Sequence, residues 1–184
     1  MFEREENVPI TKEEVRVIAL SKGRLNSGST VIDIGCGSGS ITIEAAMQVA
    51  PNGKVYAIDQ DENAIKLTQK NIVKFNVSNI EIIHSKAQEA IGKMPDADAI
   101  FVGGTGGDTY DIIKLAYNKL KSKGRIVIDT ILIETMYQSL KAVDELKLMN
   151  VDVTQIIVAK SRKVSTGTMM LARNPVIIIA AEKP

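Results

Sequence analysis

In residues 31–40, VIDIGCGSGS, an apolar run is followed by three glycines at alternate positions. Gly35, Gly37 and Gly39 would let the backbone turn sharply and lie directly against a bound molecule. The next segment has helical period, so the N–H groups of its first turn would point toward that molecule. A tight turn without a ligand uses glycines in the same way, so the loop alone is a weak signal.

Two aspartates near this loop narrow the kind of ligand. Asp33 lies two residues before Gly35, where a carboxylate would repel a pyrophosphate and would suit the ammonium of a methionine-like group. The spacing G-x-G-x-G also differs from the G-x-G-x-x-G of dinucleotide sites. Asp59 ends the next apolar run, where a carboxylate can bind both hydroxyls of a ribose. Asp59 alone would fit a helix cap, but together with the loop it favours binding.

A second glycine-rich stretch, VGGTGG at 102–107, follows a later apolar run. Glycine weakens regular structure by roughly 0.5–1 kcal/mol relative to alanine, so this cluster needs a reason. The bare backbone at Gly103 and Gly104 predicts a broad, flat acceptor, or a carboxylate held by N–H groups. A flexible turn before a helix is the alternative. The stretch lacks the Asn/Asp-Pro-Pro-aromatic motif of enzymes that methylate the amines of bases.

Strand-like runs and segments of helical period alternate along the chain, and this alternation positions both loops. The expected strands are residues 29–35, 54–59, 79–85, 97–103 and 124–132. The expected helices are residues 40–50, 62–75, 109–124 and 134–149. Near-continuous apolar strands alternating with helices predict an α/β fold with a doubly wound, mostly parallel sheet covered on both faces. In such a sheet the loops that follow the strands meet at one ligand crevice.

The C-terminal part breaks the alternation. Residues 151–159 and 174–182 are strand-like runs with no helix between them, so they should pair antiparallel at a sheet edge. The segment between them, 160–173, is expected to be an extended arm. It contains four cations and no acidic residue, namely Lys160, Arg162, Lys163 and Arg173.

Composition restricts the class of protein. The 184 residues suffice for one substantial core, and we expect a single domain over 1–184. A net charge of +1 gives no electrostatic argument for a nucleic-acid partner. A single cysteine excludes an internal disulfide and a cysteine-based metal site, and no metal is expected. The acidic start is no signal peptide and no run reaches the ~20 apolar residues of a membrane span, so we expect a cytoplasmic protein without a membrane partner.

The first loop together with Asp59 resembles the Rossmann-like S-adenosylmethionine-dependent methyltransferases, over nearly the whole chain. The resemblance implies a seven-stranded sheet in the order 3-2-1-4-5-7-6 with an antiparallel last strand. It implies that adenine lies beside residues 85–90, where an acidic residue is usual. This chain has Lys86 there, so Ala87 would offer its backbone and a small surface. The residues expected to bind the cofactor are Asp33, Gly35, Cys36, Gly37, Ser38, Gly39, Asp59 and Ala87.

Several motifs are similar to a narrower family, the cobalt-precorrin-6B C(15)-methyltransferases (decarboxylating) of anaerobic cobalamin biosynthesis. They are VPITKEEVR at 8–16, VGGTGG at 102–107, TILIET at 130–135 and GTMMLARNPV at 167–176. The resemblance implies methylation of a corrinoid precursor at C-15 with decarboxylation of its C-12 acetate, giving cobalt-precorrin-7, by a homotetramer. It also implies that Thr11 contacts S-adenosylmethionine. The stretch TKEE further fits a capping box, in which Thr11 and Glu14 each bind an N–H group of the other.

Such a substrate would be a large plate carrying many carboxylates. The bare backbone at Gly103 and Gly104 would let it approach the sulfonium to the ~3–3.5 Å of a near-attack geometry. The residues expected to bind its carboxylates are Arg162, Lys163 and Arg173. The apolar residues 169–171 would pack against another subunit. No acid–base dyad is evident, and no catalytic residue is assigned.

Two other functions stay open at this point. The stretch GCGSGSITIEAA also resembles the tRNA adenine-N1 methyltransferases, which usually carry an additional RNA-handling domain. A non-catalytic S-adenosylmethionine-binding subunit would need the same cofactor residues. His84, the only histidine, is expected to be a structural, hydrogen-bonded residue.

Overall fold

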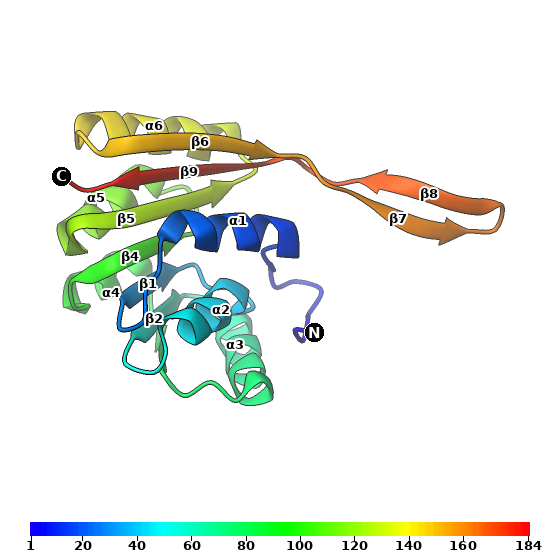
Figure 1. Cartoon of the computed structure of the whole chain (residues 1–184), viewed down its shortest axis with the longest axis horizontal. Helices are drawn as coiled ribbons and strands as arrows, with labels where there is room; N and C mark the ends of the chain where they lie inside the picture. Colours follow the sequence, from blue (N-terminus) through cyan, green and yellow to red (C-terminus); the bar gives the residue numbers. More distant parts are fainter.

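Seven strands form the central sheet in the computed structural model, which describes residues 1–184 (Figure 1). Their order is β3-β2-β1-β4-β5-β9-β6, and β9 is antiparallel to both of its neighbours. The strands are β1 (Thr30–Ile34), β2 (Lys54–Asp59), β3 (Ile80–His84), β4 (Ala97–Val102), β5 (Leu120–Thr130), β6 (Met149–Ile156) and β9 (Val176–Glu182). Because β9 is the seventh strand of this sheet along the chain, the predicted order 3-2-1-4-5-7-6 is confirmed.

Helices cover both faces of the sheet (Figure 1). One face carries α1 (Glu13–Gly23), α2 (Ser40–Val49) and α3 (Glu62–Phe75). The other carries α4 (Ala87–Ala90), the 3₁₀ turn η1 (Ile91–Lys93), α5 (Thr109–Lys119) and α6 (Ile133–Glu145). None of these helices combines the length and the apolar character that a membrane span requires.

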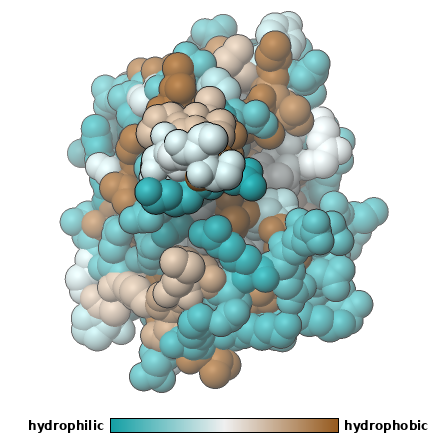
Figure 2. Space-filling model, turned by 90° about the vertical axis from the view of Figure 1, so that its right-hand side faces the viewer, coloured by the Kyte–Doolittle hydropathy of each residue, from teal (hydrophilic) through white to brown (hydrophobic).

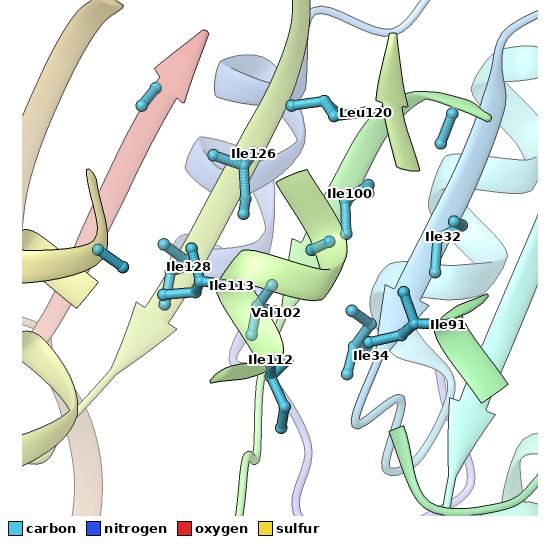
Figure 3. Close-up of a cluster of buried hydrophobic side chains, with 14 of the residues drawn as sticks. Ile32, Ile34, Ile91, Ile100, Val102, Ile112, Ile113, Leu120, Ile126 and Ile128 are labelled. Atoms are coloured by element: carbon cyan, nitrogen blue, oxygen red, sulfur yellow. The ribbon is translucent and has the colours of Figure 1, made fainter. Parts of the chain in front are cut away.

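Successive strand residues point to opposite faces and thereby divide the buried side chains between two cores. The core under α5 and α6 contains Ile34, Val102 and Ile128, packed against Ile112 of α5 (Figure 3). The core under α1 and α2 is formed by the intervening strand residues, which include Val31, Phe101 and Val127. The same alternation places Asp33 of β1 and Asp129 of β5 on the α1 face.

The predicted helix over 109–124 is too long. Helix α5 ends at Lys119, and the next residues already belong to β5, where Leu120 is buried and pairs with Ala97. A Cβ on Gly124 would lie 2.8 Å from the Lys121 carbonyl oxygen and 2.9 Å from the Leu120 side chain. Gly124 therefore permits an irregularity of the strand and does not end the helix.

The capping box predicted for Thr11 and Glu14 is also wrong. Helix α1 begins at Glu13, and its N-cap residue is Lys12, which makes no side-chain cap hydrogen bond. The carboxylate of Glu14 instead forms an ion pair with Lys160, with 2.6 Å between nitrogen and oxygen. Thr11 uses its carbonyl oxygen, which accepts a 2.8 Å hydrogen bond from the Arg16 guanidinium.

The predicted arm is extended and folds into a hairpin, β7 (Ala159–Val164) and β8 (Gly167–Ala172), which projects beyond the sheet (Figure 1). Arg162 pairs with Met169 and Lys163 with Thr168. Paired residues share a face and neighbours alternate, so Arg162 and Lys163 point to opposite faces. The register therefore places cations and apolar residues on both faces of the hairpin.

Candidate functional site

Four residues at the carboxyl ends of neighbouring parallel strands lie at one level of the sheet. Ile34 pairs with both Ile58 and Val102, and Val102 pairs with Ile128. The residues that follow are Asp59 on β2, Gly35 after β1, Gly103 after β4 and Asp129 on β5. With strands about 4.8 Å apart, this row spans about 14 Å. We call it the carboxyl-edge row.

The two glycine loops touch one another in the middle of the row. A Cβ on Gly35 would lie 2.7 Å from the Gly104 carbonyl oxygen, and one on Gly103 would lie 3.1 Å from the Gly35 carbonyl oxygen. A side chain at Gly35 or Gly103 would therefore press one loop against the other, so the packing of the loops requires glycine at both positions. Gly104 differs, because a Cβ there would meet no atom within 4 Å. Of the two glycines predicted to bind the acceptor, only Gly104 presents its missing side chain to open space.

The N-terminal segment crosses over the first loop. The Ser38 N–H donates a 3.1 Å hydrogen bond to the Pro9 carbonyl oxygen, and a Cβ on Gly37 would lie 2.7 Å from that same oxygen. Val8 is buried against Leu67 of α3, which anchors the segment. Gly37 is thus required by the chain itself, and Thr11 follows two residues after Pro9.

The first loop leaves few polar groups free. The N–H groups of Gly35 and Cys36 both donate to the Ile58 carbonyl oxygen, and Gly39 donates to Cys36. The Ser38 hydroxyl is the exception, because it is buried and has no hydrogen-bond partner. An unpaired buried hydroxyl is costly, so this group fits a site completed by a ligand. The first-turn N–H groups of α2 have no partners within their helix and point the same way.

Cys36 and Gly39 contribute to the loop's shape. The Cys36 thiol is buried and lies 3.8 Å from the Thr68 hydroxyl, and burial raises its pKa well above the ordinary value. It is therefore no nucleophile at neutral pH. Gly39 has φ +74°, and a Cβ there would meet Thr68 at 2.8 Å.

Asp59 is not the cap of α3, because its carboxylate is held at the first loop. Its Oδ2 accepts from the Gly37 N–H at 2.9 Å and its Oδ1 from the Asp61 N–H at 3.0 Å. Asp61 caps α3 by accepting from Asn63 at 2.9 Å. A carboxylate has about four lone-pair sites, so each Asp59 oxygen retains one for a ligand.

A small pocket brings the predicted adenosine residues together. It is lined by Gly35, Asp59, Ala87 and Gly104, among others. Ala87 is the first residue of the short helix α4. His84 lies beside this region, where its Nε2 is 3.1 Å from the Gln60 carbonyl oxygen.

Two carboxylates on the α1 face, buried Asp33 and half-buried Asp129, have no cation beside them. Asp33 accepts a 2.5 Å hydrogen bond from the Thr42 hydroxyl, and burial, reinforced by the charge of Asp129, raises its pKa to about 7. Burial raises the pKa of Asp129 to about 6. A positively charged ligand beside Asp33 would restore the charge of that carboxylate, since a nearby opposite charge favours the ionised form. The sequence interpretation missed Asp129, although VID at 127–129 repeats the VID of the first loop at 31–33.

The structure does not bring the predicted hairpin cations into the carboxyl-edge row. Arg162 and Lys163 are exposed on β7, and Arg173 follows β8 with its N–H bonded to Val158. Figure 2 looks at the molecule from the hairpin side, and the hairpin stands forward over a recessed surface. These cations reach a ligand at the row only if the ligand extends toward the hairpin.

Known proteins resemble this chain over its full length. A family model described as a precorrin methyltransferase domain matches residues 1–183. A curated relative from Saccharolobus solfataricus, by name a cobalt-precorrin-6B C(15)-methyltransferase (decarboxylating), is 45% identical over 186 residues, covering 100% of this chain and 94% of the relative.

Two solved structures share both fold and sequence with this chain. A precorrin-8W decarboxylase from Methanobacterium thermoautotrophicum superimposes with a TM-score of 0.91 at 34% identity, covering 98% of this chain and 96% of the other. A precorrin-6Y C5,15-methyltransferase from Geobacter metallireducens also has a TM-score of 0.91 at 34% identity, covering 99% of this chain and 94% of the other.

Proposed function

This chain belongs to the precorrin methyltransferase family, and from that premise we propose that it converts cobalt-precorrin-6B to cobalt-precorrin-7. It is an S-adenosylmethionine-dependent enzyme that methylates C-15 and removes the C-12 acetate carboxyl as carbon dioxide. The observation that carries this proposal is 45% identity over the whole length to a relative of that name. We place the reaction in the cytoplasm, without a nucleic-acid or membrane partner.

The site fits S-adenosylmethionine on three independent grounds. The donor carries a sulfonium and an ammonium, and the α1 face offers the buried Asp33 carboxylate, which has no cation beside it. Asp59 retains acceptor sites for the ribose hydroxyls, and Ala87 lies beside it in the same pocket. Ser38 offers an unpaired hydroxyl at the first loop. When bound, the donor supplies an electrophilic methyl group.

The acceptor would lie against Gly104. The absence of any atom within 4 Å of a Cβ built there supports a flat substrate resting on the backbone. The second loop abuts the first, so a plate on Gly104 lies next to the donor's end of the row. Orientation of this kind can lower a reaction barrier by several kcal/mol, about 7–11 at most.

The proposal includes a homotetramer in which the hairpin contacts a neighbouring subunit. Met169 and Met170 are 45% and 63% exposed and lie on opposite faces of the hairpin. The Lys160–Glu14 ion pair ties the base of the hairpin to α1, which holds it beside the site. One hairpin face would then meet a subunit and the other would meet the carboxylates of the substrate.

The function is tested by turnover of purified protein with cobalt-precorrin-6B and S-adenosylmethionine. We expect S-adenosylhomocysteine and carbon dioxide in equal amounts. Methylation of unmodified tRNA in a parallel assay would instead support the adenine-N1 alternative. Binding of the donor without turnover of either acceptor would indicate a non-catalytic subunit.

Asp59→Ala is expected to weaken S-adenosylmethionine binding by about 1.5–3 kcal/mol, the range for hydrogen bonds to a charged group. The variant loses both the ribose contact and the anchor of the Gly37 N–H. Isothermal calorimetry measures the change. Asp61→Ala is the matched control, because it removes the cap of α3 and leaves Asp59 in place. Equal affinities of wild type and Asp59→Ala would remove Asp59 from the cofactor site.

Single hairpin substitutions distinguish the two faces. Because Arg162 and Lys163 point to opposite faces, only one of Arg162→Gln and Lys163→Gln is expected to raise the Michaelis constant for the corrinoid. The effect should be largest at low salt, where charge pairs are least screened. Steady-state kinetics at two ionic strengths measure it, with donor affinity unchanged. Wild-type constants for both variants at low salt would exclude the hairpin from substrate recognition.

A further inference from the structure

The proposed reaction moves a proton as well as a methyl group. At C-15 a new carbon–carbon bond forms and a carbon–hydrogen bond must break, so one proton leaves. At C-12 the acetate becomes a methyl group, so its methylene carbon gains one proton as carbon dioxide departs. The reaction therefore releases one proton and consumes one, and a single acid–base group can serve both positions.

Most titratable groups near the carboxyl-edge row are already engaged. Asp33 accepts from Thr42, and both oxygens of Asp59 accept from backbone N–H groups. Glu14 pairs with Lys160 through Oε1 and leaves its buried Oε2 without a partner, and His84 contacts the Gln60 carbonyl oxygen. Asp129 differs from these groups, because no other residue forms a hydrogen bond or an ion pair with its carboxylate. Its side chain is partly accessible.

The position of Asp129 matches the acceptor end of the row. It follows Ile128, which pairs with Val102, so it lies beside Gly103 on the next strand. Asp59, which would hold the ribose, lies three strands away at the other end, about 14 Å off at normal strand spacing. A donor anchored at Asp59 and extending along the row would present its methyl group toward β4 and β5. Asp129 then faces the acceptor that rests on Gly104.

We propose that Asp129 is the acid–base residue of the reaction, a step that rests on the proposed function. As the π electrons of C-15 form the bond to the methyl carbon, the carbon–sulfur bonding pair stays on sulfur. The Asp129 carboxylate takes the C-15 proton, and the C–H bonding pair returns to the macrocycle. When the bond to the acetate carboxyl breaks, its electron pair enters the macrocycle. Protonation of the methylene carbon by the Asp129 carboxylic acid then completes the methyl group. No external acid, base or oxidant is consumed.

The local electrostatics suit this role. An acid–base catalyst is most effective when both of its protonation states are accessible near the working pH. Burial raises the pKa of Asp129 to about 6, and the carboxyl of Asp33 is the titratable group that faces it on the same side of the sheet. The neighbours of Asp129 on the adjacent strands are Gly103 and Ile178, which carry no charge.

Asp129→Asn is the test, with Asp144→Asn on the exposed side of α6 as the control. Because burial disfavours the charge of Asp129, the neutral amide should leave the folded state intact, which the melting temperature checks. At saturating S-adenosylmethionine, the single-turnover rate of cobalt-precorrin-6B conversion is expected to fall by roughly 10²–10⁴-fold. Asp129→Glu is expected to recover part of that loss, and Asp144→Asn should match the wild type.

The outcomes separate this inference from the function on which it rests. If wild type converts cobalt-precorrin-6B and Asp129→Asn does so at the same saturated rate, the acid–base role is wrong. If Asp129→Asn lowers only the donor affinity, Asp129 binds the donor's positive charge and does not carry the proton. If wild type itself converts no cobalt-precorrin-6B, the proposed function is wrong and this inference falls with it.

Discussion

Gly104→Val is expected to abolish methyl transfer while it weakens the affinity for S-adenosylmethionine much less, because Gly104 forms only one side of the donor pocket. A side chain at Gly104 would meet no atom of the protein within 4 Å, and its backbone is outside the left-handed region. The fold should therefore accept valine. The branched side chain would occupy the space where the acceptor plate rests, and a displacement of about 1 Å can cost 10²-fold in rate. Calorimetry and single-turnover kinetics measure the two effects separately.

Gly103→Ala is the informative comparison for this variant. A Cβ there would lie 3.1 Å from the Gly35 carbonyl oxygen, which is tighter than ordinary contact. Alanine at 103 should push the two loops apart and lower both stability and cofactor affinity. Loss of donor binding in Gly104→Val, with an unchanged melting temperature, would place the second loop under the cofactor and not under the acceptor.

The local pattern of the sequence is sufficient to predict the elements of the sheet. The run KVYAID matches β2 and the segment ENAIKLTQKNIVKF matches α3, residue for residue. For α3, periodicity and the boundary residues agree, since Asp61 caps the helix and Asn76 ends it in the left-handed conformation. The antiparallel last strand could also be predicted, because no helix separates residues 151–159 from 174–182.

Features that depend on distant contacts could not be predicted from sequence. Helix α5 ends early because Leu120 is buried beside Ala97, a neighbour more than twenty positions away in the chain. Glu14 fits a capping box locally, but Lys160 lies close enough to pair with it. The hairpin register, which separates Arg162 from Lys163, likewise follows from pairing across a turn.

The candidate site shows the same division between local and distant information. Its glycines could be located from the sequence, but several of them are required by contacts within the protein and not by a ligand. Gly37 is required by Pro9, and Gly35 by the second loop. Asp129 was missed because one carboxylate in an apolar strand gives only a weak local signal, here the VID that repeats the VID of the first loop. Only the pairing of β4 with β5 places it beside Gly103.

Gly35→Ala is expected to be the most disruptive substitution at the cofactor site. Gly35 has φ +74°, and left-handed backbone costs an ordinary residue roughly 1–2 kcal/mol. Its Cβ would also lie 2.7 Å and 2.8 Å from the Gly104 carbonyl oxygen and nitrogen. Backbone atoms cannot rotate away as a flexible side chain can, so the two loops must separate. Their separation displaces Gly37, which donates a hydrogen bond to Asp59, on one side. On the other side it displaces Gly104, on which the acceptor would rest.

Gly28→Ala isolates the strain from the clash. Gly28 has φ +88° in the turn before β1, and a Cβ there would meet nothing within 4 Å. Gly28→Ala should therefore lose only the roughly 1–2 kcal/mol of folding stability that a left-handed backbone costs an ordinary residue. This loss lowers the melting temperature by roughly 2–8 °C in a chain of this size. The melting temperature of Gly35→Ala should fall further. Gly35→Ala should also lose measurable S-adenosylmethionine binding, which Gly28→Ala retains. Equal melting temperatures and equal donor affinities for the two variants would mean that the close approach of Gly35 to the Gly104 backbone is not required. Gly35 would then have no special role in holding the donor.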